Sequence, residues 1–197
     1  MQRLFDASII TIKGELNLSE VNLDGSHSAA KKGGEEVAYQ GRKQAKTSHS
    51  LPVTDRNGAI IATTGIIAGN HNDSYELIEK LKHAFKDMNR CGLDIKGAFF
   101  NADSRFDTRE SRKLLWNRGV IPTIPENKRN RKTVKRGRKR HFKPDVYKHR
   151  FVRERTFAWI DKFKTLLIRF ERKAAHCLGF HHLAFALINL RNVMAKV

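Results

Sequence analysis

The first part of the chain alternates apolar and polar residues in the manner of a β-sheet. Over residues 16–24 this alternation predicts an approach and then a strand that ends near Asp24, with a turn rich in Gly and Lys after it. Two further strands are expected over residues 36–54 and 58–68, and the Asn57-Gly58 pair between them is a strong hairpin signal. The sheet is therefore expected to begin with antiparallel strands.

The rest of the chain mixes helical and extended patterns. Apolar residues recur at helical spacing from Leu77 to Met88, and Asp73 or Ser74 is the expected cap of that helix. The remaining expected elements are a strand over residues 95–103, a short helix capped by Asp107 or Thr108 and ending at Gly119, a strand over residues 120–124, a helix from about Val146 through Glu154 to Phe170, and an apolar helix from about Ala174.

This order of elements predicts a mixed α/β fold. Hairpins link the early strands, whereas the later strands need crossover connections. Three antiparallel strands followed by parallel strands, flanked by helices, is the order of a ribonuclease H-like sheet. A length of 197 residues with 40% hydrophobic content is enough to bury one core of ordinary size. We therefore expect a single domain over residues 1–197.

Positive charge is concentrated in one stretch. The chain has a formal net charge of +19 and a pI near 10.3, which favours a polyanionic partner. Fourteen Lys and Arg residues lie between Lys128 and Arg155, against only Asp145 and Glu154. We expect a basic loop over about residues 127–145 that contacts phosphates, followed by a helical C-terminal part over residues 146–197. A nucleic-acid-binding segment without a catalytic role is the alternative.

Membrane insertion and secretion are not favoured. The most apolar stretch, Ala174–Leu190, includes three histidines and an asparagine, which suits a packed helix better than a membrane span. The first 14 residues lack the continuous apolar core of a signal peptide. The two cysteines, Cys91 and Cys177, lie far apart in the sequence, as in proteins of a reducing compartment. A cytoplasmic protein without a membrane partner is expected.

Three acidic residues carry the candidate chemistry. Asp24 and Asp103 each end a predicted strand, and on neighbouring strands their carboxylates can meet. Glu154 lies on a predicted helix within the basic stretch. Carboxylate oxygens of this kind bind Mg²⁺ or Mn²⁺, and two such ions promote displacement at a phosphodiester. Each acid taken alone is well explained as a turn residue, a cap or a surface ion pair, and only their positions relative to the strands favour a metal site.

Several short motifs resemble those of a known family. They are similar to the catalytic domain of bacterial insertion-sequence transposases of the DDE type, and the resemblance extends over nearly the whole chain. The residues that carry it are the runs Leu23–His27, Ala30–Glu35, Tyr39–Lys43, Ala68–Asp73 and Asn101–Asp103.

The resemblance implies a ribonuclease H-like fold in which Asp24, Asp103 and Glu154 are the catalytic ligands of Mg²⁺ or Mn²⁺, with two ions bound. In the family the third acid follows a Tyr and an Arg, matched here by Tyr147 and Arg150, and precedes a Lys. The position seven beyond Glu154 is Asp161, and the nearest Lys is Lys162. The expected DNA-contacting residues are Tyr147, Arg150, Lys162, Arg136, Arg138, Lys139 and Arg140.

The implied activity is phosphodiester hydrolysis and strand transfer at insertion-sequence ends. Its partners would be double-stranded DNA, at the ends and at the target, and further copies of the chain, in the nucleoid. Family members carry an N-terminal segment that helps to recognise the ends, whereas this chain begins 23 residues before Asp24. Two interpretations stay open, a fragment or the second of two reading frames joined by frameshifting. A non-catalytic DNA-binding remnant of a truncated transposase is the alternative function.

Overall fold

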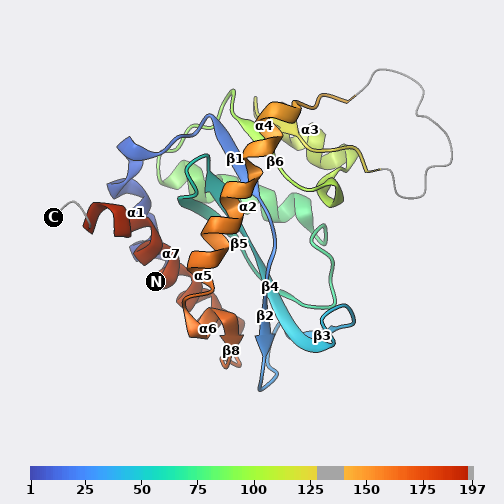
Figure 1. Ribbon diagram of the computed structural model, residues 1–197, viewed down its shortest axis with the longest axis vertical. Coiled ribbons are helices and arrows are strands. Elements are labelled where there is room, and N and C mark those ends of the chain that lie inside the picture. The colour runs from blue at the N-terminus through green and yellow to red at the C-terminus, as the bar shows by residue number, and fades with distance from the viewer. Residues whose placement is uncertain (128–139, 195–197) are drawn as a thin grey trace.

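A computed structural model describes residues 1–127 and 140–194 of the chain (Figure 1). The strands are β1 (Glu20–Leu23), β2 (Ser26–Ala30), β3 (Ala38–Gln40), β4 (Ala45–Asp55), β5 (Ile60–Ala68), β6 (Phe99–Asn101), β7 (Ile121–Thr123) and β8 (Ile168–Arg169). The α-helices are α1 (Gln2–Thr11), α2 (Leu77–Arg90), α3 (Arg109–Asn117), α4 (Pro144–Lys148), α5 (Val152–Ile160), α6 (Lys164–Leu167) and α7 (Ala174–Met194). Short 3₁₀ turns are η1 (Lys13–Glu15), η2 (Ser104–Phe106) and η3 (His149–Phe151).

All eight of these strands belong to one mixed sheet. Strand β4 pairs antiparallel with β5 and with β1, while β6 pairs parallel with β1, and β7 pairs parallel with β6. Hairpin-linked strands thus come first and parallel strands later, in agreement with the predicted mixed α/β class. In Figure 1 the α4–α5 segment crosses in front of this sheet and α2 lies behind it.

The ladder along β4 is interrupted at Asp24. Leu23 pairs with Val53, and Ser26 pairs with Ser50. Strands β1 and β2 therefore pair with β4 in the same register, and the two residues between them, Asp24 and Gly25, are unpaired. In that register Pro52 faces Asp24, and a proline has no N–H to donate to the ladder. The break leaves Asp24 outside the pairing. The predicted turn rich in Gly and Lys begins only after β2, a polar strand that the sequence did not predict and that forms through its contacts with β4.

The local sequence pattern predicted some features of α2 and α3 correctly and others wrongly. Helix α2 buries Leu77, Leu81, Phe85 and Met88, as predicted. Its predicted cap was wrong, because the helix begins only after Glu76, which has a left-handed backbone with φ of 49°. The cap of α3 was predicted correctly: the Thr108 hydroxyl accepts a hydrogen bond from the Ser111 amide at 3.0 Å.

The long helix predicted from Val146 to Phe170 is broken into shorter elements. After α5 the backbone of Phe163 is extended, and residues 168–169 form β8, which pairs parallel with β2. The Arg169 side chain is buried and donates hydrogen bonds to the carbonyls of Glu35 and Glu36 at 2.8 and 3.3 Å. These contacts with residues far away in the sequence outweigh the helical pattern.

Helices α1 and α7 lie side by side at one side of the sheet (Figure 1). Phe5 of α1, a helix that the sequence analysis did not predict, stacks on His182 of α7 with ring centroids 5.5 Å apart. Asn189 of α7 bonds both backbone groups of Ile60 in β5, at 2.9 and 2.8 Å. Within residues 1–127 and 140–194, no helix has the length and apolarity needed to cross a membrane.

Candidate active site

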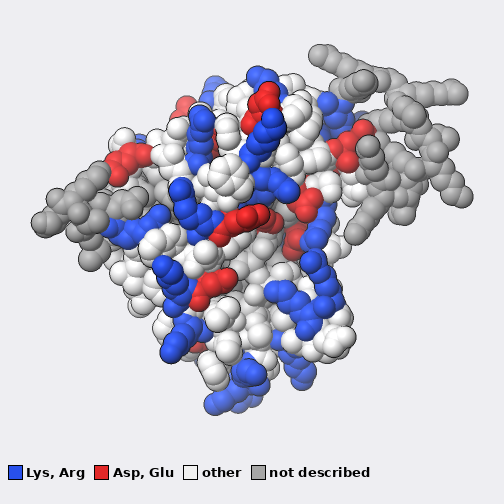
Figure 2. Space-filling model, viewed as in Figure 1, with Lys and Arg blue, Asp and Glu red and all other residues white. Residues whose placement is uncertain are grey.

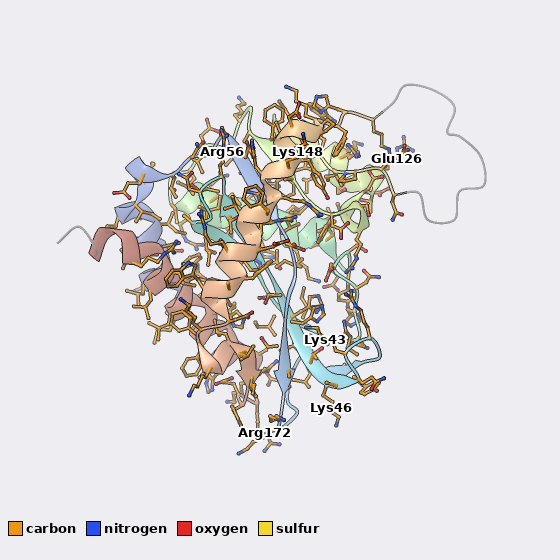
Figure 3. All side chains as sticks on the ribbon, viewed as in Figure 1. Lys43, Lys46, Arg56, Glu126, Lys148 and Arg172 are labelled. Atoms are coloured by element: carbon orange, nitrogen blue, oxygen red, sulfur yellow. The ribbon has the colours of Figure 1, made fainter. Side chains whose placement is uncertain are left out.

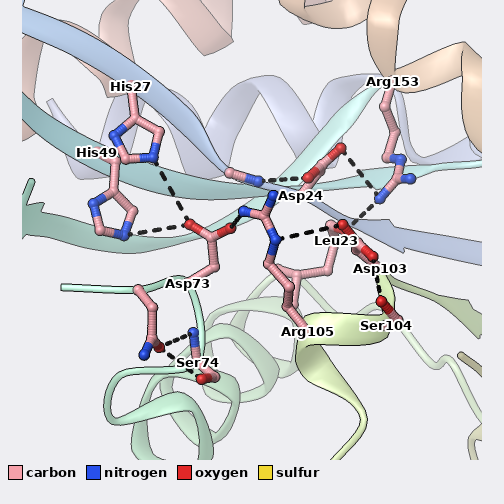
Figure 4. Close-up of polar contacts among 12 residues, drawn as sticks. Leu23, Asp24, His27, His49, Asp73, Ser74, Asp103, Ser104, Arg105 and Arg153 are labelled. Carbon is pink, nitrogen blue, oxygen red and sulfur yellow. Dashed lines mark hydrogen bonds and ion pairs between the residues drawn. The ribbon is translucent and has the colours of Figure 1, made fainter. Parts of the chain in front are cut away.

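Asp24 and Asp103 occupy equivalent positions on neighbouring parallel strands. Asn22 of β1 pairs with Asn101 of β6, so each acid lies two residues beyond the last paired position of its strand. The pair is held together inside the sheet by a hydrogen bond from Asn101 Nδ2 to Asn22 Oδ1 at 3.1 Å. Both carboxylates therefore lie at the same edge of the sheet (Figure 4).

Arginine side chains approach both acids. Arg153 of α5 donates a hydrogen bond to the Leu23 carbonyl and lies 3.5 Å from Asp24 Oδ2. Arg105 lies with its Nε 3.8 Å from Asp103 Oδ2. Burial nevertheless raises the pKa of Asp24, Arg153 opposes the rise, and the charges of Asp73 and Asp103 add to it. The pKa of Asp24 is thus raised mainly because the carboxylate is partly buried, and the neighbouring carboxylates add to the rise.

A third aspartate, Asp73, is buried next to this pair. Its Oδ2 accepts a hydrogen bond from Arg105 Nη1 at 2.9 Å, and its Oδ1 faces the Nε2 atoms of His27 and His49 at 3.9 and 3.7 Å. Burial lowers the pKa of both histidines, that of His49 to about 4, so both rings are neutral near pH 7. The sequence analysis assigned Asp73 only as a helix cap and missed Arg105. The motif run Ala68–Asp73 was the signal that could have found Asp73.

The residues before Glu154 lie close to the acids. Tyr147 accepts a hydrogen bond from Arg150 Nη1 at 3.0 Å, and the Arg150 guanidinium lies 4.8 Å from the centre of its ring. Burial raises the pKa of Tyr147, Arg150 opposes the rise, and the charges of Asp103 and Asp24 add to it. Tyr147 and Arg150 are therefore neighbours of the acid pair.

Among the described residues, Glu154 does not complete a metal site with the pair. Its side chain is exposed on α5, between Arg153, which reaches the Leu23 carbonyl, and Arg155, whose Nη2 donates to the Asn57 carbonyl at 2.9 Å. In the part of the chain that the structure describes, no three His, Cys, Asp or Glu side chains are arranged to hold a metal ion. Asp24 and Asp103 still suit Mg²⁺ or Mn²⁺, since both ligands are oxygens and Mg²⁺ is commonly bound by one or two carboxylates.

The other expected DNA contacts fall in different surroundings. Lys162 lies with its Nζ 3.8 Å from the centre of the Trp159 ring. Arg140 donates a hydrogen bond to the buried carboxylate of Asp107. Arg136, Arg138 and Lys139 lie outside the described residues, as does most of the expected basic loop.

Asp107 joins the two chain segments that flank residues 128–139. Besides Arg140 it accepts hydrogen bonds from the Asn127 amide at 2.9 Å and from Arg112 Nε at 2.7 Å. Arg112 in turn donates to the carbonyls of Ile124 and His141 at 2.6 and 3.3 Å. Burial alone would raise the pKa of Asp107, but these donors outweigh it and the pKa is lowered. The sequence analysis considered Asp107 only as a cap.

On the face shown in Figure 2, acidic side chains lie near the middle among lysines and arginines. Figure 3 places Lys148 and Arg56 towards one end of the sheet, and Lys43, Lys46 and Arg172 towards the other. The charge is therefore not confined to the stretch around residues 128–155.

Comparison with known proteins finds similarity to transposases. The family described as "Transposase DDE domain" matches residues 100–191, which include Asp103 and Glu154. A protein of Burkholderia cepacia described as "Putative transposase for insertion sequence element IS402" is 30% identical over 123 residues, which cover 62% of this chain and 53% of that protein. The chain thus matches about half the length of this curated relative.

Among solved structures, "Mos1 transposase paired-end complex with left transposon end" is similar with a TM-score of 0.40 at 11% identity, covering 61% of this chain and 40% of that one. A score this low does not establish a common fold. The domain match and the insertion-sequence relative both support a DDE transposase.

Proposed function

We propose that this chain is the catalytic part of an insertion-sequence transposase, which hydrolyses phosphodiester bonds at the ends of its element and joins the freed strand to target DNA. The observation that carries the proposal is the position of Asp24 and Asp103 at matching points on two parallel strands. The order β5-β4-β1-β6-β7, antiparallel and then parallel, supports a ribonuclease H-like sheet as the scaffold.

In this proposal Asp24 and Asp103 are metal ligands and Glu154 is the third. Mg²⁺ or Mn²⁺ bound there would supply positive charge that polarises the phosphate and activates the attacking hydroxyl. Arg153 holds Asp24 in place, because its guanidinium is fixed by the Leu23 carbonyl and by the Arg150 carbonyl at 3.1 Å. Glu154 lies on the same helix, one residue beyond Arg153.

Tyr147 and Arg150 are the proposed DNA contacts nearest to the acids. Arg150 donates to phosphate oxygens, and the Tyr147 ring under its guanidinium limits the directions in which it can point. With a net charge of +19, the chain is expected to bind DNA with an affinity that falls steeply as salt rises. The partners are therefore proposed to be insertion-sequence ends and target DNA.

A nicking assay tests this function. With Mn²⁺ and a duplex that carries the ends of the element, the parent chain should cut, and Asp103→Asn should cut at least about 100-fold more slowly. Asp145→Asn is the matched control, because the Asp145 side chain is 92% exposed and pairs with Lys148 rather than with an assigned ligand. Equal cutting by Asp103→Asn and the parent would show that the assignment is wrong.

The exposed position of Glu154 favours a second candidate, a DNA-binding remnant that no longer cuts. The two functions differ in one combined measurement. A remnant would bind DNA with the same steep salt dependence but would cut neither with Mg²⁺ nor with Mn²⁺. In the enzyme, Glu154→Gln should reduce cutting and leave salt-dependent binding in place.

A further inference from the structure

Arg105 is shared between two aspartates of different kinds. Its Nη1 donates to Asp73 Oδ2 at 2.9 Å, whereas its Nε is 3.8 Å from Asp103 Oδ2, beyond hydrogen-bond distance. The Asp73 side chain is 9% exposed and that of Asp103 is 37% exposed. The closer contact is therefore with the buried aspartate, which is the one not assigned as a metal ligand (Figure 4).

Asp73 is fixed in place by its surroundings. Gly25, directly after Asp24, has no Cβ, and a Cβ there would lie 3.0 Å from Asp73 Oδ1. On the other side are the neutral rings of His27 and His49, which face each other across β2 and β4 and stack with centroids 4.6 Å apart. A buried carboxylate needs a cationic or hydrogen-bonding partner, and Arg105 provides it.

Arg153, the arginine beside Asp24, is less free to move than Arg105. The Arg153 side chain is 4% exposed and tied to backbone carbonyls, whereas that of Arg105 is 45% exposed. Without Asp73, Arg105 could turn fully towards Asp103, and it would then compete with a cation for the same oxygens. In the structure Asp73 takes the hydrogen bond of Arg105, and Asp103 has only the longer contact.

We propose that Asp73 is a positioning residue that keeps Arg105 from hydrogen-bonding to Asp103 and so leaves the Asp103 oxygens open to a divalent cation. This inference rests on the proposed function, since it concerns the same acid pair. It assigns roles to two residues outside the catalytic triad, and it predicts that their replacements change metal affinity in opposite directions.

Titration calorimetry with Mn²⁺ alone, without DNA, tests the inference. Asp73→Asn should weaken binding by about 10-fold or more, as expected for loss of a residue that supports a metal ligand. Arg105→Gln should tighten binding several-fold. Because Arg105 carries the effect of Asp73, adding Asp73→Asn to Arg105→Gln should change the affinity much less than it does in the parent.

The matched control is Lys43→Gln, which removes an exposed positive charge that contacts neither Asp73 nor Asp103. It should leave Mn²⁺ affinity within about twofold of the parent, since an exposed charge at a distance is screened. If Arg105→Gln tightens binding no more than Lys43→Gln does, the inference is overturned. Should Asp73→Asn fail to fold, this comparison decides alone, because Arg105 is exposed.

Two outcomes separate this inference from the proposed function. If the parent binds no Mn²⁺, or if Asp103→Asn binds as well as the parent, the metal site and the inference both fail. If the parent binds and Asp103→Asn does not, while Asp73→Asn, Arg105→Gln and the double variant all bind like the parent, only the inference fails.

Discussion

Asp107 and Asp24 are both aspartates beside arginines, yet their pKa values are shifted in opposite directions. The Asp107 side chain is 0% exposed and accepts hydrogen bonds from Asn127, Arg112 and Arg140. Asp24 is 36% exposed, has Arg153 at 3.5 Å, and lies beside two further carboxylates. Hydrogen-bond donors stabilise the charge of Asp107 and make it structural, whereas Asp24 is partly buried beside other carboxylates, which suits it for a cation.

The largest expected effect is on chemistry. Asp24→Asn should lower Mn²⁺-dependent nicking at least about 100-fold, because the variant loses a charged ligand. Its far-UV circular dichroism should match the parent, since Asp24 lies outside the strand ladder. If Asp24→Asn cuts at the parent rate, Asp24 is not a metal ligand and does not differ in role from Asp107.

Asp107→Asn should show the converse, a large loss of stability. Replacing the carboxylate leaves Arg112 and Arg140 without their buried counter-charge, which costs about 3 kcal/mol of unfolding free energy. Denaturant unfolding measures it, with Asp145→Asn as the exposed control that should change stability by less than about 0.5 kcal/mol. A loss as small as that of the control would contradict the structural role.

The pH dependence of stability should also differ between the two aspartates. The folded pKa of Asp107 is lowered, so its contribution is present above the ordinary Asp pKa and is lost as pH falls through the folded pKa. The folded pKa of Asp24 is raised, so its ionisation destabilises the folded state as pH rises from the ordinary Asp pKa through the folded pKa.

Metal-free Asp24→Asn should therefore be more stable than the parent near pH 7, and this gain should disappear below the ordinary Asp pKa. Unfolding curves in a chelator from about pH 3 to about pH 7 measure both trends. The parent should be more stable than Asp107→Asn near pH 7 and lose this advantage as pH falls. If the advantage instead shrinks as pH rises, the prediction for Asp107 is contradicted.

The smallest effect concerns the helix that carries Arg112. Thr108→Ala removes the hydroxyl that caps α3 and should cost about 1 kcal/mol. Thr165→Ala, at an exposed helical threonine, is the control and should stay within about 0.5 kcal/mol of the parent. If both variants lose equal stability, the Thr108 cap does not stabilise the helix that positions Arg112 beside Asp107.

Local patterns predicted those parts of the fold that depend on nearby residues. The apolar face of α2, the Thr108 cap and the Asn57-Gly58 turn are of this kind. In that turn Gly58 has φ of 89°, and a Cβ there would lie 2.7 Å from Thr156 Oγ1. Asp24 and Asp103 could be considered together because each follows a predicted strand.

Other parts depend on distant residues and were missed. Strand β2 has little apolar alternation and exists through β4, and β8 exists through β2. Asp73 resembles a helix cap until the fold places Arg105 and two histidines around it. For Glu154 the motif spacing matches the family, whereas in the described part of the chain its side chain is exposed and does not form a three-residue metal site with the pair.

The central claim is that Asp24 and Asp103 bind one divalent cation between them. Anomalous diffraction from crystals of the chain soaked in Mn²⁺ tests it most directly. The account predicts an anomalous peak coordinated by carboxylate oxygens of both residues. A peak bound elsewhere, or none at Mn²⁺ concentrations that support nicking, would contradict it.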